Sequence, residues 1–268
     1  MKKYGFLLFA ICWAFASAMT AQSVPSEATA VTGTFTAVLL GANEPNGGDP
    51  TAVGFASVTL DESARTVTFT LAETGLSSPP TAAHIHRGPS GVNGQIVVPF
   101  NFPFTNGVAS GVVTGVDDSL IREIAGNPAN FYANIHNSPF PGGAIRGQLM
   151  PAPGTTTGTC LADSTTLCLN QGRFKVQVAF QTATAAGIGK AIPLTGDTGS
   201  FWFFSQNNLE LMIKVVDGRA VNGKFWFFSG GLSDVGYAIT VTDLTTGTVR
   251  TYAAPRGTQS ALNDTSAF

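Results

Sequence analysis

Short segments that alternate apolar and polar residues, each bounded by turn residues, are the feature that most constrains this chain. Residues 54–60 and 66–71 alternate in this way on either side of the polar residues 61–65. Successive side chains of an extended strand point to opposite faces, so such segments form strands with one buried face. The two segments therefore predict a β-hairpin.

About seven or eight segments of this kind follow one another between residues 32 and 150, separated by Gly, Pro and Asn. This pattern favours an antiparallel sandwich or barrel. One short helix is expected at residues 120–125, capped by Asp117 or Ser119 and stopped by residues 126–128. Charged residues make up only 11% of the chain, against about 25% in typical soluble domains, and this composition also suits strands and turns.

The N-terminus has the layout of a secretory signal peptide. Two lysines precede an apolar run at residues 4–15 and the small residues 16–18, so we expect a leader over residues 1–21. The run is too short for a membrane-spanning helix, and no membrane span is expected once the leader is removed. The mature protein is therefore expected to be secreted or to lie in the periplasm or cell envelope. With 14 basic and 16 acidic residues and no basic cluster, nucleic acid is excluded as a partner.

Removal of the leader removes Cys12 and leaves Cys160 and Cys168. An even pair in a chain sent to an oxidising compartment favours a disulfide, which would stabilise the fold by about 2–3 kcal/mol. The alternatives are two buried free thiols or a metal site, and a metal site would need further ligands nearby.

Residues 151–159 are rich in Pro, Gly and Thr, which predicts a linker between two antiparallel β domains. The second domain, residues 160–254, contains an internal repeat: GSFWFFS at 199–205 recurs as GKFWFFS at 223–229. Each copy precedes a strand that ends in Asp, so each half is expected to be a strand–loop–strand unit. The apolar runs need cover on both faces, and a neighbouring loop is expected to cover the face away from the core. The alternative is an exposed aromatic patch that binds a partner or a glycan. Residues 255–268 are expected to be a loose tail.

The chain has three histidines, and two of them, His84 and His86, share one face of a predicted strand. His136 lies on the polar face of a second predicted strand, residues 131–136, whose other face is apolar. If the two strands are neighbours, three imidazoles meet at one patch, and such a patch can bind Cu or Zn. The alternative is a set of polar-face residues that bond to each other, to Asn134 or to loop carbonyls.

Several motifs of this first part together resemble the CHRD domain, a module first described in chordin and found in exported bacterial proteins. They are LGANEP at 40–45, AHIHRGP at 83–89, YANIH at 132–136 and GAIRGQL at 143–149. The resemblance covers residues 32–150 and implies an all-β extracellular module without an established catalytic activity. Residues 160–254 resemble an uncharacterised β module of exported bacterial proteins.

Glu44 and Arg146 both fall within these motifs, on a chain that is poor in charge. They are expected to form a bidentate carboxylate–guanidinium pair that ties the first loop to the last strand. The alternative is two independent solvated charges.

The favoured functional interpretation is an exported, non-catalytic binding or structural module whose partner is a protein or a glycan. No motif typical of an enzyme is found in the sequence. The alternative function is a metal-binding protein or enzyme, with Cu or Zn held by His84, His86 and His136.

Overall fold

The computed structural model describes residues 30–152 and 160–268, and both parts are built almost entirely from antiparallel strands. The predicted leader and residues 153–159 of the predicted linker lie outside the described residues. The strands of the N-terminal part are β1 (Thr32–Leu40), β2 (Val53–Asp61), β3 (Thr66–Thr74), β4 (Pro80–Arg87), β5 (Gln95–Pro99), β6 (Val108–Thr114), β7 (Phe131–Asn137), β8 (Ile145–Gln148) and β9 (Met150–Pro151). Its helical segments are η1 (Gly41–Asn43), α1 (Asp118–Gly126) and η2 (Pro128–Asn130).

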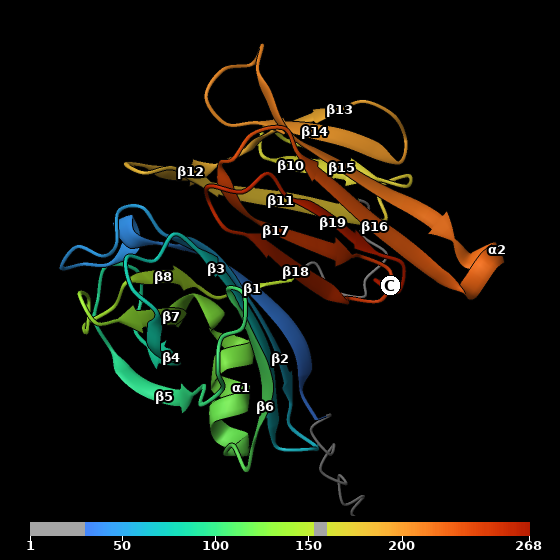
Figure 1. Ribbon diagram of the computed structural model, residues 1–268. Coiled ribbons are helices and arrows are strands. Elements are labelled where there is room, and N and C mark those ends of the chain that lie inside the picture. The colour runs from blue at the N-terminus through green and yellow to red at the C-terminus, as the bar shows by residue number, and fades with distance from the viewer. Residues whose placement is uncertain (1–29, 153–159) are drawn as a thin grey trace, which may run out of the picture.

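The nine strands form one sheet in the order β5-β4-β7-β8-β1-β2-β3-β6, with β9 paired to β1. The sheet curves strongly, and α1 lies between its two edge strands, β5 and β6 (Figure 1). The hairpin predicted at residues 54–71 is confirmed as β2 and β3. The predicted helix is confirmed as α1, with Asp117 at its N-cap.

The inner face of the curved sheet carries the hydrophobic core. Alternate residues along β1, namely Phe35, Ala37 and Leu39, point into it, and Ile121 and Ile124 of α1 close the open side. The residues between these three point to the opposite face, because neighbouring side chains on a strand point in opposite directions. Val38 and Leu40 therefore lie on the outer face.

The C-terminal part is a two-layered sandwich. Its strands are β10 (Thr166–Leu169), β11 (Phe174–Gln181), β12 (Ala186–Ile188), β13 (Lys190–Pro193), β14 (Thr198–Trp202), β15 (Leu209–Gly218), β16 (Lys224–Gly231), β17 (Gly236–Asp243), β18 (Val249–Ala254) and β19 (Ala261–Asp264), and its helix is α2 (Arg219–Asn222). One sheet has the order β10-β11-β17-β18 with β12 paired to β11, and the other has the order β13-β14-β15-β16-β19. The second core is enclosed between these two sheets.

The disulfide predicted between Cys160 and Cys168 is confirmed, with the two Cα atoms 5.7 Å apart. It joins the start of the sandwich to β10. No helix among the described residues is long and apolar enough to cross a membrane.

Each copy of the repeat forms a strand that is followed by a loop and a second strand, as expected, but the two units pair differently. The first copy contributes β14, which pairs with the following strand β15. The second copy contributes β16, whose two edges are occupied by β15 and β19. The strand that follows, β17, therefore pairs in the other sheet, between β11 and β18.

The expectation of a loose tail after residue 255 is also wrong. Residues 261–264 form β19 on the edge of β16. Ala267 is fully buried, and its carbonyl accepts a hydrogen bond of 2.8 Å from Nε of Arg250. Phe268 packs against the sandwich core. The tail is ordered because its apolar end covers a core that would otherwise be exposed.

The aromatic runs are fully covered on one face and partly covered on the other. Phe201 and Phe227 are fully buried in the sandwich core, whereas Trp202 and Trp226 on the opposite face are half-buried. Phe204 is 54% exposed. The expected cover on both faces is therefore incomplete.

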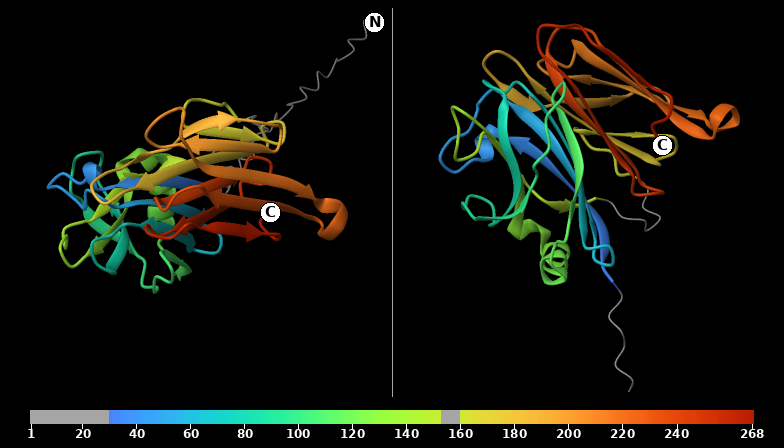
Figure 2. Two further views of the ribbon diagram at one scale, coloured as in Figure 1. Left: turned by 45° about the horizontal axis from the view of Figure 1, so that its top comes forward. Right: turned by 60° about the horizontal axis from the view of Figure 1, so that its bottom comes forward.

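The two parts of the molecule are in contact through their sheets (Figure 2). Val53 and Phe55, on the outer face of β2, pack against Ala179 and Ala238 of the sandwich. The hydroxyl of Thr74 donates a hydrogen bond of 3.2 Å to the carbonyl of Ala254. The small side chains allow close approach of the two sheets, so sheet faces hold the parts together.

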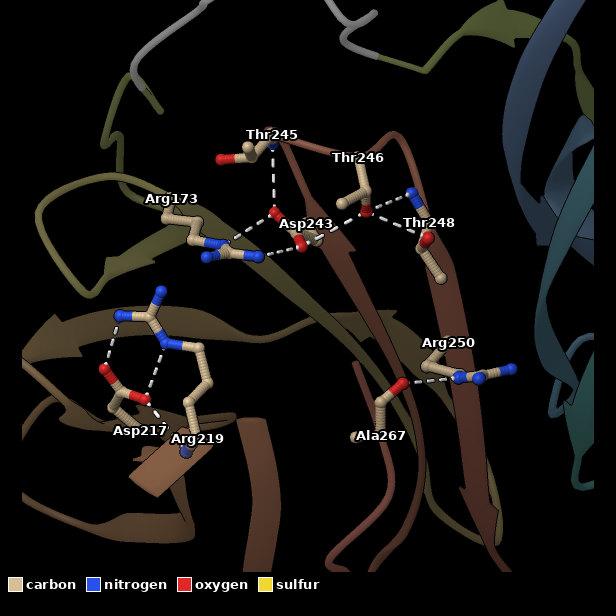
Figure 3. Close-up of polar contacts among 9 residues, drawn as sticks. All are labelled: Arg173, Asp217, Arg219, Asp243, Thr245, Thr246, Thr248, Arg250 and Ala267. Carbon is tan, nitrogen blue, oxygen red and sulfur yellow. Dashed lines mark hydrogen bonds and ion pairs between the residues drawn. The ribbon is translucent and has the colours of Figure 1, made fainter. Parts of the chain in front are cut away.

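Two acidic residues at strand ends of the sandwich are each held by an arginine (Figure 3). Asp243 is 1% exposed and accepts bonds of 3.0 and 2.7 Å from Nε and Nη2 of Arg173. Burial alone would raise the pKa of Asp243, but the hydrogen bonds from Arg173, Thr245 and Thr246 outweigh it and hold the pKa below its usual value. Asp217 forms the analogous pair with Arg219 at the surface.

These matched pairs predict different costs for the same substitution. Asp243→Asn removes the charge that Arg173 faces inside the protein, and we expect a loss of about 1.5–3 kcal/mol in the free energy of unfolding. Asp217→Asn removes an exposed pair, which contributes little, and we expect no measurable change. Denaturant unfolding of both variants checks this, and equal destabilisation would contradict the assignment.

Candidate metal centre

The three histidines lie on neighbouring strands of the curved sheet. His84 and His86 come from β4 and His136 comes from β7, and these strands pair antiparallel with His84 opposite Asn134 and His86 opposite Tyr132. The intervening residues point into the core, where Ile85 and Ile135 are fully buried. Because the core takes the inner face, all three imidazoles are placed on the outer face.

The convergence predicted from the sequence is confirmed. One ligand atom from each of the three imidazoles can be chosen such that all lie within 4.8 Å of one another. The ring centroids of His84 and His136 are 4.9 Å apart, and those of His84 and His86 are 5.4 Å apart. The closest pair of atoms is Nδ1 of His84 and Nε2 of His136, at 3.1 Å.

Two backbone carbonyls orient two of the rings. Nδ1 of His86 lies 3.0 Å from the carbonyl oxygen of Gly94, and Nδ1 of His136 lies 3.0 Å from that of Pro141. A carbonyl only accepts, so Nδ1 carries the hydrogen in both rings and Nε2 keeps its lone pair. Nε2 of His86 is buried and has no hydrogen-bond partner among the described residues. His86 and His136 thus each present an unprotonated Nε2 to the cluster.

The pKa values of all three histidines are lowered. Burial is the largest cause in each case, and for His84 the neighbouring His136 and His86 lower the pKa further, to about 4. Burial likewise lowers the pKa of His86 and of His136, although their bonds to carbonyls act in the opposite direction. The imidazoles are therefore neutral at pH 7, which is the form that binds metal ions.

The spacing of one pair of nitrogens matches that around a metal ion. Two nitrogens at about 2.0–2.1 Å from one tetrahedral ion lie about 3.3 Å apart, close to the 3.1 Å between His84 and His136. His86 and His136 are buried, whereas His84 is only half-buried. Three protein ligands would thus leave a fourth position for a small molecule, such as water.

A stack of three side chains supports His86 from behind. The ring of Tyr132 is stacked on His86 with centroids 4.8 Å apart, and the guanidinium carbon of Arg146 lies 3.5 Å from the Tyr132 centroid. The Tyr132 hydroxyl accepts a bond of 3.1 Å from the amide of Gly94. Nη1 of Arg146 donates to the carbonyl of Val92 at 3.1 Å. Residues 88–94 are thereby held over the outer face, with the Gly94 carbonyl aimed at His86.

The predicted ion pair between Glu44 and Arg146 is wrong. Arg146 is almost fully buried, but its guanidinium donates to the carbonyls of Val92 and Pro89 and to Gln148. Glu44 instead accepts a bond of 2.8 Å from Nδ2 of Asn134. Arg146 reaches towards residues 88–94 because their carbonyls need donors once they cover the sheet.

Glu44 is enclosed by two glycines. A Cβ atom on Gly143 would collide with Oε1 of Glu44, and one on Gly48 would lie 2.8 Å from its Cγ. Burial raises the pKa of Glu44 to about 7, although the charge of Arg146 and the bond from Asn134 lower it. Asn134 thus connects this carboxyl group to the position opposite His84.

Sequence reasoning missed the orienting carbonyls of Gly94 and Pro141 and the role of Tyr132. The only signal for Tyr132 is its place on the polar face of β7, two residues before Asn134. No sequence pattern identifies a backbone carbonyl that lies in a loop.

Comparison with family models places residues 35–149 in the CHRD domain family. The match contains the three histidines, Glu44 and Arg146, and the sandwich lies outside it. The family predicted from the motifs is thereby confirmed for this part of the chain. Comparisons with curated proteins and with solved structures gave no match.

The lowered pKa values predict how the metal-free protein responds to acid. The unfolded chain binds protons at its histidines near pH 6.5, whereas folded His84 does so only near pH 4. Stability that is present above pH 6.5 is therefore lost as the pH falls towards 4. NMR titration of the imidazole carbons should show His84 titrating near pH 4 and the other two below 6.5. A value of 6.5 or above for His84 would contradict the described geometry.

Proposed function

We propose that this chain, whose residues 35–149 are a CHRD domain, is an exported protein that binds one copper or zinc ion through His84, His86 and His136. The observation that carries the proposal is the convergence of three imidazole nitrogens within 4.8 Å, with the Nε2 atom of His86 buried and unpartnered among the described residues. The proposed activity is binding, with the fourth position open to water or to a partner's ligand.

Copper and zinc are the metals that suit this set of ligands. Imidazole nitrogen binds Zn and Cu well, whereas Ca and Mg prefer carboxylate and carbonyl oxygens. The cluster consists of three histidines and includes no carboxylate. The nearby Glu44 is bonded to Asn134.

Export is supported by three independent features. Residues 1–21 have the composition of a leader. The sandwich contains the disulfide between Cys160 and Cys168, and such bonds persist in oxidising compartments. The CHRD family itself is extracellular. These features support secretion or a place in the periplasm or cell envelope.

A second candidate is a metal-free binding or structural module with a protein or glycan partner. The 3.1 Å separation of Nδ1 of His84 and Nε2 of His136 is also that of a normal hydrogen bond. This bond would satisfy two of the three rings without a metal. It leaves Nε2 of His86 buried and unpaired, which is costly and favours the metal-binding proposal.

Titration of the mature protein with Zn²⁺ and Cu²⁺ tests the proposal. We expect one ion per chain, with no comparable binding of Mg²⁺. His136→Gln should weaken binding by more than about 100-fold, because loss of the outer hydrogen-bond partners of a ligand alone costs about 10–100-fold. His86→Gln should have the same effect, although His86 lies fifty positions earlier in the chain than His136.

Arg87→Gln is the matched control. Arg87 is adjacent to His86 but points to the other face of β4, where it pairs with Glu123 at the surface. This variant should bind metal as the unmodified protein does. If His86→Gln and His136→Gln bind as tightly as Arg87→Gln, the metal proposal is wrong and the hydrogen-bonded patch remains.

Tyr132→Phe tests the support behind His86. The variant keeps the ring that stacks on His86 but removes the hydroxyl that accepts the Gly94 amide. The Gly94 carbonyl is then held less firmly against Nδ1 of His86, and we expect metal affinity to fall about tenfold. Isothermal titration calorimetry measures the metal affinity. An unchanged affinity would show that the hydroxyl has no part in placing His86.

A further inference from the structure

A groove of about 330 Å³ lies between the curved sheet and the facing sheet of the sandwich. Arg146 and Gln148 of β8 line one wall, and Lys175 of β11 and Thr242 of β17 line the other. Its volume is at the lower end of the range of ligand pockets, about 300–1,000 Å³. None of the three histidines lines it, so it is separate from the candidate metal centre.

Polar side chains without protein partners gather in this groove. Lys175 pairs with Thr242, and Gln177 with Thr240, across adjacent strands on the face that looks towards β1. Within residues 30–152 and 160–268, the side chains of Lys175, Gln177 and Thr242 make no hydrogen bond to protein. The hydroxyl of Thr240, a residue only 4% exposed, is buried and unpartnered. Buried polar groups normally have partners, so the Thr240 hydroxyl lacks a partner that a polar ligand would supply. Lys175 and Gln177 are half-buried and open to such a ligand.

The charge of the groove favours an anion. Lys175 and Arg146 contribute two positive charges, and no carboxylate is among the lining residues. The donors of Arg146 are occupied by the carbonyls of Val92 and Pro89, whereas the Lys175 ammonium forms no ion pair with a described residue. Burial lowers the pKa of Lys175, and the charge of Asp163 acts on this pKa in the opposite direction. A carboxylate near Lys175 would supply the missing counter-charge.

The groove also offers apolar surface. Val38 and Phe55 form part of its lining, together with Met150, which is 62% exposed. A ligand that combines a negative charge, hydroxyl groups and exposed C–H groups would match these walls. Sugar carboxylates have this combination, because the ring carries hydroxyls at its edge and C–H groups on its faces.

We propose that this groove is a binding site for a small sugar carboxylate of the hexuronate class. The Lys175 ammonium binds the carboxylate, and the Gln177 amide and the Thr242 hydroxyl bind the ring hydroxyls. Val38 and Met150 cover the apolar face of the ring. The site requires both parts of the chain, since each contributes one wall.

Titration of the full mature chain with glucuronate, monitored by calorimetry and by NMR shifts, tests the proposal. Glucuronate should bind, and glucose and acetate should each bind at least tenfold more weakly. Lys175→Gln should weaken glucuronate binding at least tenfold, as expected for loss of a charge-assisted bond. Thr242→Val, which removes the hydroxyl with little change of shape, should weaken it severalfold.

Lys224→Gln is the control, because Lys224 is an exposed lysine of β16 that is not among the lining residues. It should leave glucuronate binding unchanged. Absence of glucuronate binding would show a groove filled by water only and would overturn the proposal. Equal binding of glucose or acetate, or an unaffected Lys175→Gln variant, would overturn the assignment of a sugar carboxylate.

Discussion

Burial of the inner face of the curved sheet is the constraint on which the rest of the structure depends. Ile85, Ala133 and Ile135 are fully buried between the sheet and α1. A shift of β4 or β7 by one residue would expose this set and bury the histidines in its place. The register that protects the core therefore also places the three imidazoles on the outer face. The same strand pairing therefore determines both the burial of the core and the position of the candidate site.

Loops on the outer face supply carbonyl groups that orient the imidazole rings. The Gly94 and Pro141 carbonyls determine which nitrogen of His86 and of His136 carries hydrogen. Arg146 holds the first of these loops through the Val92 carbonyl. This explains why an arginine is almost fully buried without a carboxylate partner among the described residues: its charge is delocalised over a planar group that carbonyls and an aromatic ring can satisfy.

The contact between the two parts follows from small side chains on facing sheets. Ala179 and Ala238 allow the sandwich to approach Val53 and Phe55 closely. Further along the same strands, Lys175 and Thr242 are larger and polar, and a groove remains. The same face of β11 and β17 thus provides both an apolar contact and a candidate ligand site. Small apolar residues form the contact, and larger polar residues line the groove.

The sequence by itself determined the strand content, the CHRD family, the disulfide and the shared face of His84, His86 and His136. These follow from periodicity, from motifs and from parity along a strand, which are local properties. Only the tertiary structure decided that β4 and β7 are neighbours, that Glu44 bonds Asn134, and that residues 261–268 pack on the sandwich. Strand order, loop carbonyls and the partner of a buried charge depend on contacts between residues far apart in the chain. A local pattern carries no information on such contacts, since many pairings satisfy it equally.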